Sequence, residues 1–189
     1  MTQGRTLILT LMVAGLAAGL IAAAGKPSTD GMAVPKYDAD GALLLPKDFD
    51  DWIFVGASMG LSYSENDRHE GPGLFHNVYM QPEAYRYYKA TGDFPEQTMF
   101  VMTNYAPSQK SEIIRSGYFE GKQVGLEVAL KDQDRFEDGW AYYNFSSPEG
   151  LRETAKPFPR FACWDCHAEH GEDDNVFVQY YPTLRRLKR

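Results

Sequence analysis

The only two cysteines of the chain, Cys163 and Cys166, are separated by two residues, and His167 follows directly. A C-x-x-C-H run is the sequence signature of covalent c-type haem attachment. Two thiols at this spacing can add to both vinyl groups of one porphyrin, and the adjoining imidazole can bind the iron as its proximal axial ligand. The sequence therefore predicts one covalent haem c, held by Cys163 and Cys166 with His167 on the metal.

Three other interpretations of these residues stay open at this point. A thioredoxin-like C-x-x-C requires a βαβ unit, and this pair lies near the C-terminus with no such pattern before it. A structural zinc site requires four ligands, so it would have to recruit His167, His170 or a distant carboxylate such as Asp173. A disulfide between the two cysteines is compatible with an oxidising compartment.

The N-terminal segment agrees with the haem interpretation. After Arg5 the chain is apolar and uncharged up to small residues of the A-x-A type, which is typical of a secretory signal peptide. Haem is attached to such motifs on the outer face of a bacterial inner membrane, so we expect a periplasmic protein with a signal peptide at residues 1–24. An uncleaved anchor is the alternative, because about 18 apolar residues can span a bilayer, although the many Ala and Gly residues favour cleavage.

Composition predicts one acidic domain. The stretch 25–45 is rich in Gly, Pro, Asp and Lys and reads as an N-terminal arm or linker, which leaves 46–189 as the haem domain. The formal net charge is −7, which disfavours nucleic acid as a partner. Acidic residues over 169–174 and basic residues over 185–189 could dock a redox partner protein, or could simply be solvated surface.

The pattern of apolar residues predicts a mainly β (α+β) fold, an antiparallel sheet with a few short helices. A helix is expected over 82–90, with Pro82 early, Glu83 in the first turn and Gly92 after the end. Aromatic and β-branched runs between turn residues predict strands over 52–55, 74–79, 98–105 and 139–145, a hairpin or long bent strand over 118–131, and a tail over 176–187 that begins extended and ends helical.

Short motifs follow one another along almost the whole domain. They are Leu45-Pro46-Lys47, Trp52, Val55-Gly56, Val78-Tyr79, Pro82-Glu83-Ala84-Tyr85, Gly92-Asp93-Phe94, Gly125-Leu126-Glu127-Val128, Lys131-Asp132, Arg135-Phe136, Gly139-Trp140-Ala141-Tyr142, the C-x-x-C-H run, Val176-Phe177 and Tyr181-Pro182. Their order and spacing resemble the cytochrome P-460 family and its relative, cytochrome c′-beta. This resemblance implies a homodimeric, mostly β haem protein with the motif histidine on one haem face and a pocket on the other.

The resemblance also implies roles for strand residues. In the hydroxylamine-oxidising members a strand lysine is bonded to the porphyrin, and a glutamate on a neighbouring strand assists proton removal. The glutamate position falls on Glu127, which could instead be a solvated or salt-bridged strand carboxylate. The lysine position falls on Met102, and no lysine lies between Lys89 and Lys110, which argues against hydroxylamine oxidation.

Two further alternatives concern the distal side of the haem. Cytochrome c′-beta relatives carry bulky aromatics there and bind NO or CO; Phe75 and Phe100 could serve in this way, or could be core residues. Met102 could ligate the iron through its thioether, because His/Met ligation is common in electron-transfer cytochromes, or could pack in the core. Met99 is expected on the opposite sheet face or offset from the site, and His76 is a candidate polar pocket residue.

The sequence is therefore compatible with three functions. The first is a periplasmic electron carrier with His167 and Met102 as axial ligands. The second is a five-coordinate protein that binds NO or CO, and the third, weakened by the missing lysine, is a hydroxylamine-oxidising enzyme.

Overall fold

The computed structural model of the protein describes residues 26–62, 71–109, 113 and 115–188. The predicted signal peptide lies outside these residues. Within the described part of the chain, no helix is both long enough and apolar enough to cross a membrane.

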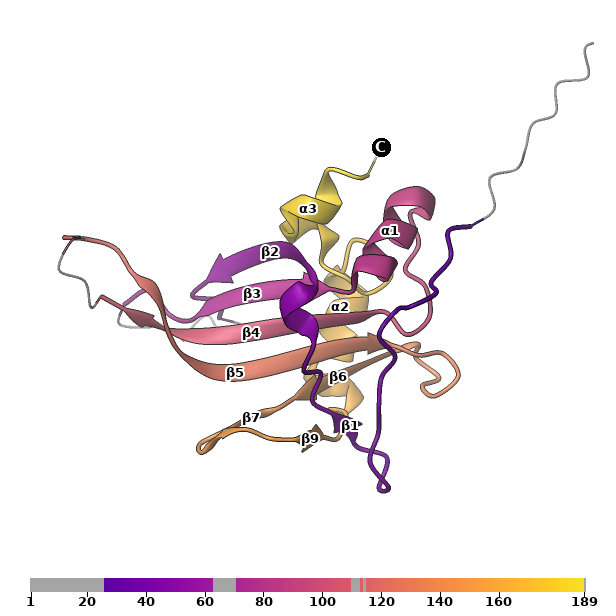
Figure 1. The fold of residues 1–189 in the computed structure, drawn as a ribbon, viewed down its shortest axis with the longest axis horizontal. Helices are drawn as coiled ribbons and strands as arrows, with labels where there is room; N and C mark the ends of the chain where they lie inside the picture. Colours follow the sequence, from indigo (N-terminus) through magenta and orange to yellow (C-terminus); the bar gives the residue numbers. More distant parts are fainter. Residues whose placement is uncertain (1–25, 63–70, 110–112, 114, 189) are drawn as a thin grey trace, which may run out of the picture.

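A five-stranded antiparallel sheet forms the centre of the molecule (Figure 1). Its strands are β2 (Ile53–Met59), β3 (Phe75–Met80), β4 (Met99–Ser108), β5 (Phe119–Lys131) and β6 (Trp140–Asn144). Each strand pairs with the one that follows it in the chain. This confirms the predicted mainly β (α+β) fold. The segment predicted as a hairpin or a bent strand is one long strand, β5, whose pairing with β4 shifts near Asn104 and Tyr105.

Short strands extend the fold beyond the central sheet. β1 (Leu43–Leu44) pairs with β9 (Thr154–Ala155), and β7 (Ser146–Ser147) pairs with β8 (Gly150–Leu151). Leu43 is fully buried, so the end of the predicted arm packs as part of the domain core. Two-residue strands carry no readable alternation, which is why the sequence pattern did not reveal them.

Three α-helices lie in the described part of the chain. α1 (Pro82–Thr91) matches the predicted helix. Pro82 lies in its first turn, and Gly92, with φ of 81°, is its C-cap. α3 (Pro182–Arg185) follows the 3₁₀ turn η3 (Val178–Tyr180) in the tail. α2 (Trp164–His170) was not expected; it follows η2 (Arg160–Ala162) and carries the C-x-x-C-H motif. A further 3₁₀ turn, η1 (Phe49–Asp51), precedes β2.

The sheet has two buried faces. The helix face, which includes Val78, Phe100 and Tyr142, packs against side chains from all three helices or the segments that lead into them. The opposite face, which includes Val101 and Leu126, packs in a second cluster with the N-terminal arm. Because alternate residues of a strand point to opposite faces, each strand residue can be assigned to one face from its neighbours.

Candidate haem site

The imidazole of His167 is held with one nitrogen bonded and the other available. Its Nδ1 lies 2.8 Å from the carbonyl oxygen of Asn175. A carbonyl only accepts, so Nδ1 carries the proton and donates, which leaves the lone pair on Nε2 for a metal. The ring lies between Tyr142 and Phe177, at centroid distances of 4.3 and 4.4 Å. Burial lowers the pKa of His167, which favours the neutral form that a metal requires.

The segment after α2 brings the Asn175 carbonyl to this position. The Gly171 N–H donates to the His167 carbonyl and ends the helix. A Cβ at Gly171 would lie 2.5 Å from the His167 carbonyl oxygen and 2.7 Å from the Asn175 backbone. A residue without a side chain is therefore required for the chain to return so closely to the helix.

The two cysteines present free thiols from one end of α2. Cys163 is half-buried and Cys166 is exposed, and neither is in a disulfide. Burial raises the pKa of the Cys163 thiol, and the nearby Glu127 carboxylate and Cys166 raise it further. In the described ranges, no cluster of three or more His, Cys, Asp or Glu side chains could hold a metal ion, so the zinc interpretation finds no ligand set there. Two free thiols beside an imidazole with an open Nε2 fit a covalent haem c.

Met102 and Glu127 lie side by side on the helix face. They are cross-strand partners between β4 and β5, and Val78 is the partner of Met102 on β3. Met102 is partly buried and packs on the same cluster as Cys163 and Trp164. Met99 lies on the opposite face, as predicted. The structure therefore brings both strand residues singled out by the resemblance to the face that carries the motif.

A hydrogen-bonded polar chain adjoins this pair. His76 Nδ1 lies 2.8 Å from Oδ1 of Asn104, and Asn104 Nδ2 donates to Glu127 Oε1 at 3.5 Å. His76 and Asn104 are buried. Burial raises the pKa of Glu127, while the Asn104 hydrogen bond and the charge of His76 oppose that rise. Asn104 was not predicted, because an asparagine within a strand carries no sequence signal of its own.

The two aromatic candidates are placed differently. Phe100 lies on the helix face but is buried between Phe94, Trp140 and Tyr181, so it forms core packing below the site. Phe75 pairs with Tyr105 and, by alternation, points to the face opposite that of His76. The structure therefore does not bring Phe75 to the motif.

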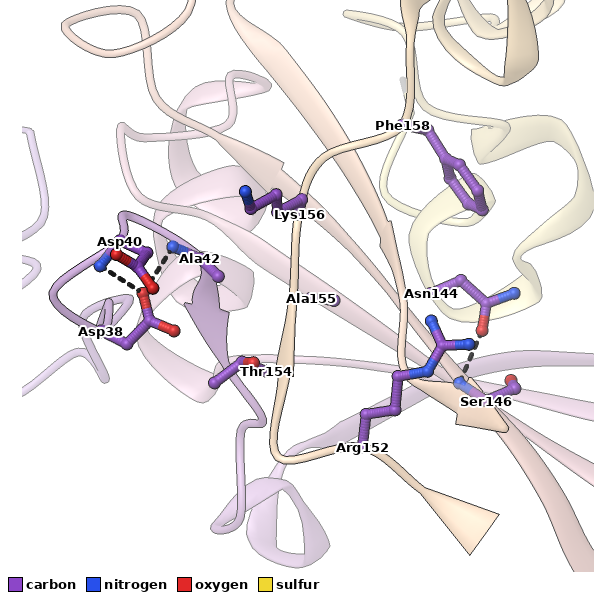
Figure 2. A pocket seen from close by; sticks show the side chains of 10 residues that line it. All are labelled: Asp38, Asp40, Ala42, Asn144, Ser146, Arg152, Thr154, Ala155, Lys156 and Phe158. Atoms are coloured by element: carbon purple, nitrogen blue, oxygen red, sulfur yellow. Dashed lines mark hydrogen bonds between the residues drawn. The ribbon is translucent and has the colours of Figure 1, made fainter. Parts of the chain in front are cut away.

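A cavity lies between the N-terminal arm, the end of β6 and the segment around β9 (Figure 2). It has a volume of about 590 Å³ and is lined by residues that include Asp38, Asn144, Arg152 and Lys156. None of the predicted site residues lines it. Asn144 lines this cavity and is also the cross-strand partner of Glu127, so it lies between the cavity and the Met102–Glu127 pair. A second cavity, of about 250 Å³, is lined by residues that include Tyr142 and Trp164.

Comparison with known proteins agrees with this arrangement. The sequence model of the Cytochrome P460 family matches residues 46–178, a range that contains the motif, Met102 and Glu127. The chain belongs to the Cytochrome P460 family. Membership makes this protein a c-type haem protein with covalently bound haem c. No curated protein matches the chain.

Proposed function

We propose that this member of the Cytochrome P460 family is a periplasmic, mono-haem electron-transfer cytochrome in which His167 and Met102 are the axial ligands. The observation that carries the proposal is the position of Met102: it lies on the helix face, partly buried, in the cluster that also holds Cys163. Haem c, when bound, supplies a one-electron couple between ferric and ferrous iron.

The residues of the chain hold and tune the ligands. The Asn175 carbonyl fixes the orientation and tautomer of His167, and Tyr142 and Phe177 restrain the ring on both sides. The thioether of Met102 is a soft ligand that favours ferrous iron and raises the reduction potential. Met102 is partly buried by the apolar side chains of the helix face.

Absorption spectra and redox titrations of the wild type and Met102→Ala test this proposal. We expect a low-spin six-coordinate wild type. The variant should be high-spin, bind CO faster, and have a reduction potential lower by on the order of 0.1 V, a fraction of the roughly 0.8 V that axial ligands span. Met99→Ala is the matched control, because Met99 lies on the opposite face. A high-spin wild type whose spectrum and potential are unchanged in Met102→Ala contradicts Met102 ligation.

In that event a second function, binding of NO or CO at an open sixth position, is favoured by the His76–Asn104–Glu127 chain. Buried polar side chains near a distal face can hydrogen-bond a small ligand. Asn104→Leu would then change the dissociation rate of the bound gas, whereas a Met-ligated protein would bind the gas slowly and show little effect of this substitution.

Hydroxylamine oxidation is the weakest candidate, since Met102 occupies the position of the cross-linking lysine. Lys131 is a buried lysine, but it does not replace the cross-linking lysine. Its ammonium donates hydrogen bonds to the Phe94 carbonyl and the Asp174 carboxylate. We expect little turnover of hydroxylamine with an artificial electron acceptor; robust turnover would contradict this expectation.

A further inference from the structure

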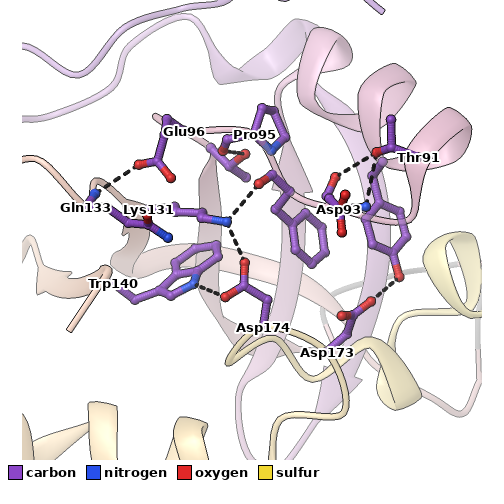
Figure 3. A network of polar contacts seen from close by, with 12 residues as sticks. Thr91, Asp93, Pro95, Glu96, Lys131, Gln133, Trp140, Asp173 and Asp174 are labelled. Carbon is purple, nitrogen blue, oxygen red and sulfur yellow. Dashed lines mark hydrogen bonds and ion pairs between the residues drawn. The ribbon is translucent and has the colours of Figure 1, made fainter. Parts of the chain in front are cut away.

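The segment that supplies the carbonyl to His167 is anchored to the sheet by an ion pair between the buried Lys131 and the exposed Asp174 (Figure 3). The Lys131 ammonium donates to Oδ2 of Asp174 at 2.7 Å and to the Phe94 carbonyl at 2.8 Å. The indole N–H of Trp140 donates to Oδ1 of the same carboxylate at 3.1 Å. Lys131 is only 9% exposed. Both oxygens of Asp174 are thus tied to neighbouring strands of the sheet, β5 and β6.

The backbone at this anchor has an uncommon conformation. Asp174 and Asn175 have φ values of 44° and 61°, in the left-handed region, which Asp and Asn adopt more readily than other residues with side chains. The contacts of Asp174 with Lys131 and Trp140 hold this turn against the sheet. The residue after Asp174 is Asn175, whose carbonyl accepts the Nδ1–H of His167. The Asp174 anchor therefore acts on the residue that orients the imidazole.

Stability alone is a weak explanation for this ion pair. The Asp174 carboxylate is open to solvent, and ion pairs with an exposed partner contribute little to stability. In contrast, outer partners that fix a ligating histidine strongly affect metal sites, because they set its orientation and its basicity. Asp174 directly precedes Asn175, whose carbonyl contacts His167. The pair is therefore placed to act as such an outer partner of the histidine.

We propose that Lys131 and Asp174 are positioning residues, which hold the Asn175 carbonyl against Nδ1–H of His167 and thereby set how strongly the imidazole donates to iron. The proposal deepens the proposed site: it rests on His167 as an axial ligand, and it is independent of Met102 ligation and of electron transfer. The geometry behind it is the chain of contacts from Lys131 through Asp174 and Asn175 to His167.

Two substitutions that remove charges of opposite sign distinguish a positioning role of this pair from a through-space electrostatic effect on the haem. Asp174→Asn removes a negative charge, and Lys131→Met removes a positive charge. If the pair acts on the haem only through space, the first raises the reduction potential and the second lowers it. If the pair positions the carbonyl, both variants weaken the Nδ1–H bond, make the imidazole a poorer donor to ferric iron, and raise the potential.

The experiment measures reduction potential and solvent exchange of the His167 Nδ1–H by NMR, on the haem-loaded protein. We expect both variants to shift the potential upward and to exchange this proton faster, by about tenfold, because a weakened hydrogen bond opens more often. Glu153→Gln is the matched control, because it breaks the exposed Lys47–Glu153 pair and should change neither quantity.

Trp140→Phe is the milder variant if either substitution prevents folding. It removes one hydrogen bond to Asp174 and keeps an aromatic ring, so it should move both quantities in the same direction by less. Opposite shifts in potential, or an unchanged exchange rate, would overturn the positioning role. The wild-type spectrum and the haem content of denatured protein report separately whether His167 and Met102 ligate, so failure of the proposed function would be seen independently.

Discussion

His167 uses its two ring nitrogens for two tasks, since Nδ1 donates to a carbonyl and Nε2 is left for iron. The thiols of Cys163 and Cys166 are free beside it. Attachment therefore requires only that both thiols add to one porphyrin, with no help from a strand lysine.

This predicts the covalent state of the purified protein. We expect the intact mass to exceed that of the exported chain by one haem, with no second type of protein–porphyrin bond. In the double variant Cys163→Ala, Cys166→Ala, haem should be lost on denaturation, because iron ligation alone does not survive unfolding. His170→Ala, which changes an exposed histidine of the same helix, should retain haem. Retention of haem by the denatured double variant would contradict thioether attachment.

Glu127 provides a prediction on pH. Burial raises the pKa of its carboxyl in the folded protein, so the folded state holds this proton more tightly than the unfolded chain. Its contribution to stability is therefore present below the ordinary carboxyl pKa, about 4.3, and is lost as pH rises through the raised value. Glutamine does not titrate. Relative to wild type, Glu127→Gln should gain stability with rising pH across that window.

Urea unfolding of wild type and Glu127→Gln at a series of pH values checks this expectation. Glu153→Gln serves as an exposed control, whose difference from wild type should be nearly flat. A pH-independent difference for Glu127→Gln would show that the carboxyl titrates normally.

Among single residues, the sequence predicted those that carry their own signal. Cys163, Cys166 and His167 form a contiguous motif, and the resemblance singled out Met102 and Glu127. Asn104 and Asn175 were missed because they act through tertiary contacts, the latter only through its backbone. Alternation could not decide which face Glu127 occupies until neighbouring strands fixed it.

At the scale of elements, side chains of β4 and β7 approach β5 closely at Gly125. A Cβ there would lie 2.6 Å from Ser146 Oγ and 3.0 Å from Asn104 Nδ2. Gly125→Ala should therefore push Asn104 away from Glu127 and destabilise the protein by about 1–3 kcal/mol, the usual cost of overpacking. Chemical denaturation measures this change. Val124→Ala alters the adjacent, partly exposed residue and should have a smaller effect; equal effects would contradict close packing at Gly125.

Helices and strands were predictable where the segment was long enough to show a pattern of apolar residues. The strands of the central sheet and α1 were anticipated from aromatic runs and from Pro82 and Gly92. α2 was missed because it is only seven residues long and is exposed, so it shows no apolar stripe. The same brevity concealed β1 and β9.

At the scale of the whole molecule, the homodimer implied by the resemblance stays a prediction, and the sheet offers a location for it. β4 and β5 continue past their last pairing with β3, at Phe75 and Tyr105, and project from the body (Figure 1). Tyr118 and Phe119 at this end are 43% and 38% exposed. Aromatic side chains in such a position are typical of protein–protein interfaces.

We expect Phe119→Glu to raise the dissociation constant of the dimer about tenfold or more, equivalent to about 1.4 kcal/mol. Sedimentation equilibrium measures the constant. Val34→Glu places the same charge at an exposed apolar residue of the N-terminal arm and should leave association unchanged. A wild type that is monomeric at all concentrations would contradict the dimer itself.

The chain-order arrangement of the sheet also bears on when the haem can be attached. Each strand from β3 to β6 pairs with the strand that precedes it in the chain, and the C-x-x-C-H motif comes only after β6. Since a chain is made N-terminal end first and local pairing is fast, the sheet can close before residues 163–167 arrive. We therefore expect the sheet to form without the motif, so that haem attachment can follow it.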